Sequence, residues 1–196
     1  GKQWSYDGDR FSPAAEIDCP SFAAYGKTFI YDQSAVRACD ERGCTAIPIA
    51  EGSWVYAYAA SGGATIALTN WGDALLFRDG KWCRMWRHSN DIYRCLSDRE
   101  PAMLKAPRKV QFYSSTLFRG QIIVGEWPTG RLYEFDGRAL KPSRNQPPFV
   151  TGDRVGYEAQ SMEVYCGDLY VGYWPTGEVW RYSASARKDK EKFGSY

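Results

Sequence analysis

The sequence is poor in the residues that metal and nucleophile chemistry require. Its 196 residues include one histidine, His88, and six cysteines without a Cys-x-x-Cys pair, so the ligand spacings of zinc sites are missing. No apolar run reaches 18 residues, which excludes a membrane-spanning helix. The formal charge of +2 gives no reason to expect a nucleic-acid or acidic-membrane partner. We therefore expect no metal, no cofactor, no nucleic acid and no membrane span.

Catalytic signatures are also missing. No G-x-G-x-x-G, Walker or D-x-D-x-D-G pattern occurs. His88 has Ser89 and Asp91 beside it, but neighbouring side chains on a hairpin tip cannot adopt a Ser-His-Asp geometry. Glycoside hydrolysis needs two carboxylates that converge in one pocket, and nothing local pairs the acidic residues found in or near turns. These residues are Asp32, Asp73, Glu126, Asp153 and Glu158.

Apolar and aromatic residues are abundant. Hydrophobic residues make up 44% of the chain and aromatic residues 16%, with 8 Trp and 14 Tyr, enough for a full hydrophobic core. The chain opens on Gly1-Lys2-Gln3-Trp4 without a Met, so we expect a processed or excised piece.

The even number of cysteines predicts disulfides. Cys39 and Cys44 flank a four-residue turn, and Cys83 and Cys95 lie symmetrically about Ser89, so each pair fits a hairpin. Cys19 and Cys166 would then staple the two ends of the chain. This is the geometrically simplest of about 15 connectivities, and six reduced core thiols are the alternative. Disulfides predict a secreted or cell-surface protein.

The chain repeats itself. Four stretches each read as an apolar strand, a turn with Gly or Asp, and an alternating strand, and in the last three this second strand closes on an aromatic residue. They are "KTFIYDQSAVRACDERG" (27–43), "ATIALTNWGDALLFRDG" (64–80), "QIIVGEWPTGRLYEFDG" (121–137) and "DLYVGYWPTGEVWRYSA" (168–184). Asp-Gly after an aromatic residue, at 7–8, 79–80 and 136–137, is a strong hairpin signal.

A short strand precedes each repeat, at 22–26, 53–63, 110–120 and 162–167. Four antiparallel strands in a meander, with a period of about 50 residues, predict a β-propeller blade. We expect an all-β propeller of four four-stranded blades, with five blades or a fragment of a larger ring as alternatives. The best helical candidate, residues 98–107, is interrupted by two prolines and lies in the longest connection.

The two ends suggest how the ring would close. Residues 2–16 match the third and fourth strands of a blade, whereas the last repeat lacks a convincing fourth strand. We therefore expect a single propeller domain over residues 1–186, whose last blade is completed by residues 10–14, followed by a charged, solvated tail over 187–196. An incomplete terminal blade would also permit self-association through its edge.

Residues 121–137 and 168–182 resemble the blades of bacterial propellers grouped with kelch-like and sialidase-like repeats, which read approximately "LYVGTWPTGRVYRYDG". The kelch double glycine, the WD dipeptide and the sialidase Asp-box are absent from this sequence. No sialidase catalytic residue can be placed on it, so the resemblance implies a fold and no activity.

The Trp-Pro-Thr-Gly turns carry the functional hypothesis. Turn geometry accounts for Pro128, Gly130, Pro175 and Gly177, but not for the tryptophans, which either pack between blades or offer stacking platforms for sugar rings. The candidate ligand-binding residues are Asn70, Trp71, Glu126, Trp127, Tyr173 and Trp174. We predict a non-catalytic module that binds a carbohydrate or glycoconjugate. The alternatives are a protein-interaction propeller and, third, a glycosidase-like enzyme.

Overall fold

The computed structural model describes residues 4–6, 11–13, 21–32, 34–87, 91–96, 110–150, 155–183 and 190–195. Every regular element in these ranges is a β-strand. Sixteen of the strands form four successive antiparallel meanders, which we call blades 1 to 4. Four-stranded meanders that succeed one another along the chain are the blades of a β-propeller, so the predicted fold class is confirmed.

The blades use these strands in chain order. Blade 1 comprises β3 (Ser21–Ala24), β4 (Lys27–Tyr31), β5 (Ala35–Asp40) and β6 (Gly43–Pro48). Blade 2 comprises β7 (Val55–Ser61), β8 (Ala64–Thr69), β9 (Ala74–Arg78) and β10 (Lys81–Arg87). Blade 3 comprises β12 (Gln111–Phe118), β13 (Gln121–Trp127), β14 (Leu132–Phe135) and β15 (Ala139–Pro142). Blade 4 comprises β16 (Glu158–Tyr165), β17 (Asp168–Trp174), β18 (Glu178–Tyr182) and β19 (Lys190–Ser195).

The first hairpin of every blade turns in the same way. Its two central residues both have positive φ, which a type I′ turn requires and which glycine adopts without strain. These pairs are Tyr25–Gly26, Gly62–Gly63, Arg119–Gly120 and Cys166–Gly167. Asp79–Gly80 makes the same kind of turn between β9 and β10. The hairpin predicted from Asp-Gly at residues 79–80 is thus confirmed.

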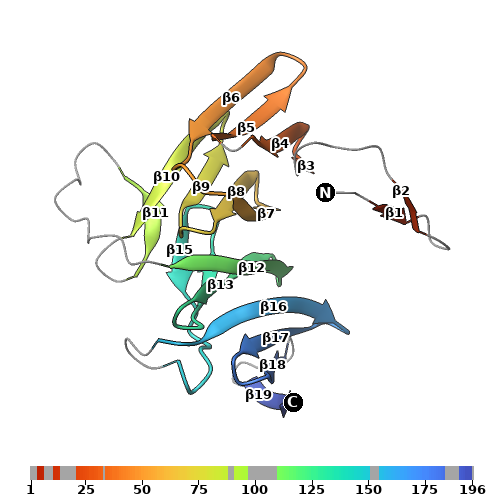
Figure 1. The fold of residues 1–196 in the computed structure, drawn as a ribbon, viewed down its shortest axis with the longest axis vertical. Helices are drawn as coiled ribbons and strands as arrows, with labels where there is room; N and C mark the ends of the chain where they lie inside the picture. Colours follow the sequence, from red (N-terminus) through yellow and green to blue (C-terminus); the bar gives the residue numbers. More distant parts are fainter. Residues whose placement is uncertain are drawn as a thin grey trace.

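The blades succeed one another as an arc. Figure 1 shows blade 1 at one end of the long axis and blade 4 at the other. The main core lies between blades 2 and 3, where Ile66 and Leu68 meet Ile122 and Val124. A second cluster joins blade 3 to blade 4, and smaller clusters join blade 1 to blade 2. Each blade therefore buries its apolar residues against its neighbours, as in other repeat proteins.

A short additional strand links two blades at their outer edge. β11 (Tyr93–Cys95) pairs with β10 of blade 2 and with β15 of blade 3. Blades 2 and 3 thereby share one nine-stranded sheet. This strand covers the outer edges that both blades would otherwise expose. The predicted helical segment 98–107 and His88 lie outside the described residues.

Blade 4 is completed differently from the prediction. Its fourth strand is β19, which pairs with β18 and comes from the stretch that we expected to be a solvated tail. Residues 11–13 form β2 (Phe11–Pro13), which pairs with β1 (Trp4–Tyr6) in a separate hairpin. The prediction that residues 10–14 complete the last blade was wrong, because β19 occupies that position. The charged residues 190–192 can form this strand because an outermost strand needs no apolar alternation.

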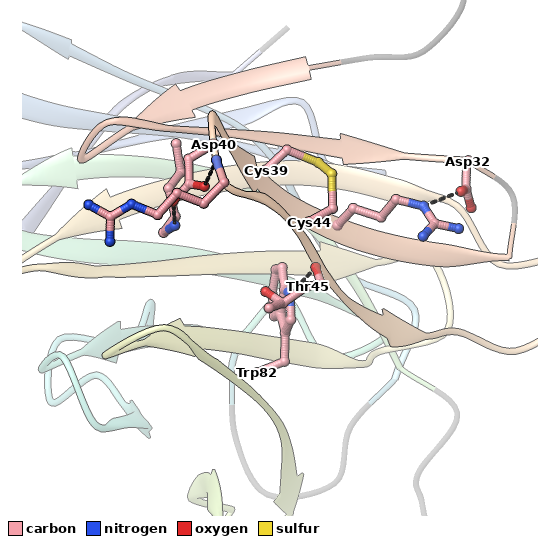
Figure 2. Close-up of a disulfide and its surroundings, with 9 residues drawn as sticks. Asp32, Cys39, Asp40, Cys44, Thr45 and Trp82 are labelled. Carbon is pink, nitrogen blue, oxygen red and sulfur yellow. Dashed lines mark hydrogen bonds and ion pairs between the residues drawn. A yellow bond between two sulfur atoms is a disulfide. The ribbon is translucent and has the colours of Figure 1, made fainter.

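Two predicted disulfides are confirmed. Cys39–Cys44 joins directly opposed residues of β5 and β6, and Cys83–Cys95 joins β10 to β11. Figure 2 shows the first bridge on blade 1, near the Asp32–Arg37 ion pair. Cys166 is exposed and free among the described cysteines; Cys19 lies outside them, so the third pairing stays a prediction. Two disulfides indicate folding in an oxidising environment.

Candidate binding surface

The turn between the second and third strands docks each middle blade onto the next one. In blade 3 the carbonyl of Pro128 accepts hydrogen bonds from the N–H groups of Gly156 (2.8 Å) and Tyr157 (3.0 Å), which lead into blade 4. Thr129 forms a parallel bridge with Tyr157. A Cβ on Gly130 would lie 2.9 Å from the Tyr157 Cβ, so only glycine fits there. In blade 3, the Pro-Thr-Gly sequence is therefore an inter-blade contact.

The three residues predicted in front of the turn tryptophans are buried. Asn70 accepts the Trp54 N–H at its Oδ1 (2.9 Å) and contacts the Gly52 carbonyl (3.4 Å). Glu126 accepts the Thr129 hydroxyl (2.9 Å). The hydroxyl of Tyr173 lies 3.5 Å from that of Tyr182. These side chains stabilise the ends of their strands and offer no free surface to a ligand.

The turn tryptophans are more accessible but are not equivalent. Trp71 is 54% exposed and Trp174 is 51% exposed, whereas Trp127 is half-buried. Strand pairing places Thr69, Glu126 and Tyr173 at matching positions, opposite Val55, Phe112 and Ala159. Asn70 therefore matches Trp127 and Trp174, and Trp71 is one residue further along. The three tryptophans are therefore not at equivalent positions, because the blade 2 turn is one residue shorter.

The first strands of blades 2, 3 and 4 share a β-bulge that sequence reasoning missed. Each strand has a register shift at the same place, between residues 55 and 57, 112 and 114, and 159 and 161. The additional residues are Tyr56, Tyr113 and Gln160. Bulges re-aim a side chain and are frequent next to functional sites.

Around the bulges lies a row of aromatic side chains, which we call the aromatic row: Trp54, Tyr56 and Tyr113. Trp54 is 47% exposed and meets Tyr56 edge-on, with ring centroids 5.9 Å apart. Tyr56 stacks on Tyr113 across the boundary between blades 2 and 3, with centroids 4.9 Å apart. The indole N–H of Trp71 donates to the Gly52 carbonyl (3.3 Å), two residues before Trp54.

Glu158 ends the row on the blade 4 side. The residue as a whole is only 7% exposed, and its Oε1 has no hydrogen-bond partner among the described residues. Burial raises the pKa of Glu158. The hydrogen bond with Tyr56, burial and the charge of Glu158 together raise the pKa of Tyr113 to about 12. The row and Glu158 thus present tyrosine hydroxyls and one acceptor that lacks a donor, which favours a ligand with an N–H or O–H group.

A separate ionic cluster ties the blade 3 turn to the β10–β11 connection. Asp91 accepts from Arg87 and, at 2.7 Å, from Arg131. Burial raises the pKa of Asp91, but the two guanidinium groups lower it by more. The pKa of Asp91 therefore lies below its usual value. Burial likewise raises the pKa of Tyr133, whose hydroxyl lies 3.3 Å from the Glu126 carboxylate. This cluster is structural, because each charge has a partner within the protein.

The other acidic candidates are engaged elsewhere. Asp32 caps its own turn and pairs with Arg37 at 2.5 Å, which lowers its pKa to about 2. Asp73 pairs with Arg84 at 2.5 Å, and Asp153 lies outside the described residues. In the described part of the chain, no group of three or more metal-ligating side chains gathers, and no helix could cross a membrane.

A cleft of about 840 Å³ lies between blades 2 and 3, on the side of β11. Its lining combines four cations, two carboxylates and apolar residues; the charged residues are Arg78, Asp79, Arg94, Asp136, Arg138 and Lys141. Arg78 donates to the Gly137 carbonyl (2.7 Å) and Lys141 pairs with Asp136 (2.6 Å). Arg78 therefore holds blade 2 to blade 3, and Lys141 is paired within blade 3. The aromatic row is the stronger candidate for a ligand site.

Comparison with known proteins finds distant structural similarity only. No family model and no curated protein matches the chain. Among solved structures, it is similar to PorZ, an essential surface component of the type-IX secretion system of Porphyromonas gingivalis. This match has 14% identity and a TM-score of 0.43, and covers 99% of the chain but only 33% of PorZ.

Two further structures are similar over most of the chain. YCF48 from Cyanidioschyzon merolae matches at 10% identity and a TM-score of 0.34, over 94% of this chain and 75% of that one. The N-terminal domain of Nup159 matches at 12% identity and a TM-score of 0.36, over 91% of this chain and 53% of that one. All three are propeller-type folds. At such identities the likeness says nothing of function, so function is inferred from this chain's own residues.

Proposed function

We propose that the chain is a non-catalytic binding module, acting in an oxidising, extracellular setting, that recognises a protein through the aromatic row and Glu158. The observation that carries the proposal is the row itself, which runs across the first strands of blades 2 and 3 and ends at an unpartnered carboxylate oxygen of Glu158, on the first strand of blade 4. Tryptophan and tyrosine are enriched at the centres of protein interfaces, where they combine apolar area with a polar tip.

Carbohydrate binding is the second candidate, and the half-exposed indoles of Trp71 and Trp174 favour it. An exposed indole face can stack on a sugar ring while neighbouring polar groups bind hydroxyls. The inequivalence of the three turn tryptophans places this candidate second, because a site repeated in every blade would need matching platforms.

The test is selection of binders from a displayed peptide library, with a glycan array run in parallel on the same protein. Variants Trp54→Ala, Tyr113→Ala and Glu158→Gln remove members of the site, and Trp86→Ala, which alters a 42% exposed tryptophan on β10, is the matched control. We expect selected peptides to lose about tenfold or more in affinity on Trp54→Ala and to keep it on Trp86→Ala.

Glycan binding that depends on Trp71 and Trp174, without peptide binding that depends on Trp54, would replace the first candidate by the second. Peptides whose affinity is the same for all four variants would contradict the assignment of the aromatic row. Each variant is first compared with the wild type by thermal unfolding, so that loss of binding is not confused with loss of fold.

A further inference from the structure

The cleft between blades 2 and 3 gathers cations from three separate elements. Arg78 belongs to β9 of blade 2, Arg94 to the connecting strand β11, and Arg138 to the turn between β14 and β15 of blade 3. Lys141, on β15, completes the set. Blades 1 and 4 pack on the far sides of blades 2 and 3, so the cleft belongs to the middle of the arc (Figure 1).

Strand pairing places these cations around one space. Arg94 lies directly opposite Ala139, and opposed residues point to the same side of a sheet, as do residues two apart along a strand. Lys141 therefore shares a side of the sheet with Ala139 and Arg94. Arg78 reaches this side from blade 2, where its Nη1 donates to the Gly137 carbonyl at 2.7 Å. The cleft is thus spanned by a hydrogen bond that fixes its width.

The two carboxylates of the lining do not cancel its positive charge. Asp136 is engaged within its own turn, where one oxygen accepts from Lys141 at 2.6 Å and the other accepts two backbone N–H groups. The side chain of Asp79 is 93% exposed and lies 3.9 Å from the Arg78 Nε. Four cations and two carboxylates leave an excess of two positive charges at the cleft. Such an excess favours an anionic ligand.

Arg138 is the cation best placed to bind that anion. Its side chain is exposed, and its guanidinium makes no hydrogen bond or ion pair with the described part of the chain. The turn that carries it is fixed, because the Asp136 Oδ1 accepts the Arg138 backbone N–H at 3.0 Å. A planar guanidinium binds a carboxylate through two parallel N–H···O bonds, which adds geometric specificity to the attraction.

The rest of the lining is apolar and held in place. Leu76, Ile92 and Ala139 contribute aliphatic side chains, and Cys95 is bridged to Cys83, which ties β11 to β10. The volume of about 840 Å³ falls within the range of about 300–1,000 Å³ that is usual for small-molecule sites. A single inorganic anion would leave most of this space and its apolar wall unused. The cleft therefore suits a ligand that joins an anionic group to an apolar body.

We propose that this cleft is a second binding site, which takes a small organic acid. The carboxylate of the acid pairs with Arg138 and the neighbouring cations, and its apolar body lies against Leu76 and Ile92. The disulfide and the Arg78–Gly137 hydrogen bond preform the walls, so little conformational entropy is lost on binding. The site is separate from the aromatic row and does not require the function proposed for it.

The experiment is an NMR titration of the full chain with naphthoate, indole acetate and octanoate, each compared with its neutral primary amide. We expect at least one acid, and none of the amides, to shift the backbone resonances of Gly137 and Arg138. Arg138→Gln is expected to weaken this binding about tenfold or more, and Arg138→Lys to weaken it less, because the charge is kept. Arg144→Gln, which alters another exposed arginine of blade 3 outside the cleft, is the control and leaves binding unchanged.

A second variant tests the cleft from its other side. Lys141→Gln leaves Asp136 without its counter-ion and is expected to weaken binding as well. Thermal unfolding verifies that each variant is folded. The proposal is overturned if no acid of the panel binds at millimolar concentration, if acid and amide bind equally, if inorganic phosphate binds as tightly as the acids, or if Arg144→Gln loses as much as Arg138→Gln. Trp54→Ala should leave acid binding unchanged, so the result does not depend on the ligand of the aromatic row.

Discussion

Trp127–Gly130 and Trp174–Gly177 have the same four residues, and both contain a cis X-Pro peptide bond. Their surroundings differ. The first turn accepts two hydrogen bonds from the entry to blade 4 and buries its threonine. The second receives no such strand among the described residues and leaves its tryptophan half in solvent. One sequence thus serves as an inter-blade contact in one place and as a free surface in the other, and the difference lies in whether a neighbouring blade covers the turn.

The largest expected difference between the two turns comes from the glycines that precede them. A Cβ on Gly125 would lie 2.5 Å from the Ala159 carbonyl and 2.7 Å from its Cβ, and neither can move without the strand. A Cβ on Gly172 would meet the Ser161 hydroxyl at 2.6 Å, and a hydroxyl can rotate away. Gly125→Ala is expected to cost about 2–3 kcal/mol of unfolding free energy and Gly172→Ala less than about 1 kcal/mol. Urea unfolding of both variants measures the difference, and equal losses would contradict the inter-blade role.

The threonines give a smaller contrast. The Thr129 hydroxyl donates to the buried Glu126 carboxylate at 2.9 Å, so Thr129→Ala removes a donor from a buried charge and is expected to cost about 1–3 kcal/mol. The Thr176 hydroxyl accepts the Glu178 N–H at 3.3 Å in a part-buried turn, and Thr176→Ala is expected to change stability by about 0.5 kcal/mol or less. Chemical unfolding of the matched pair is the measurement. A larger loss at Thr176 would mean that the second turn is also covered.

The smallest effect concerns the residues opposite the two tryptophans, Gln111 and Glu158. Burial raises the pKa of Glu158 above its unfolded value, so the folded state holds its proton more tightly. Stability therefore falls as the pH rises from the unfolded pKa of Glu158 through its raised folded pKa. Glu158→Gln, which copies the residue of blade 3, should remove this part of the pH dependence and leave the protein slightly more stable at neutral pH. Thermal unfolding of the wild type and of Glu158→Gln at several pH values measures both effects. A variant that is less stable than the wild type at neutral pH would show that the carboxylate has a favourable partner.

The repeat could be predicted from sequence because its signals are local. Gly26, Gly63, Gly120 and Gly167 mark the first hairpins, and alternating apolar residues mark the strands around them. Strand β19 escaped notice because Lys190–Ser195 is an outermost strand that lacks apolar alternation. β11 escaped notice because its pairing with β15 joins segments more than 40 residues apart.

The sequence does not separate the exposed members of the candidate ligand-binding set from the buried ones. Trp71 and Trp174 are exposed as a ligand contact requires, but Asn70, Glu126 and Tyr173 are buried. Whether such a side chain is buried depends on which side of its strand faces the preceding blade. The sequence of the strand does not reveal which side this is. The aromatic row depends on β-bulges, which have no sequence signal here. The one sequence signal for the row is that Tyr56 and Tyr113 occupy the same position near the start of the first strands of blades 2 and 3.

Trp127–Gly130 holds the entry to blade 4, and amide hydrogen exchange measured by NMR tests this contact most directly. Gly156 and Tyr157 precede β16 and have only the Pro128 carbonyl as the described acceptor of their N–H groups. We predict that both amides exchange as slowly as those within β16, and that Gly125→Ala accelerates them. Exchange of the two amides at the rate of an unprotected loop in the wild-type protein would contradict the claim.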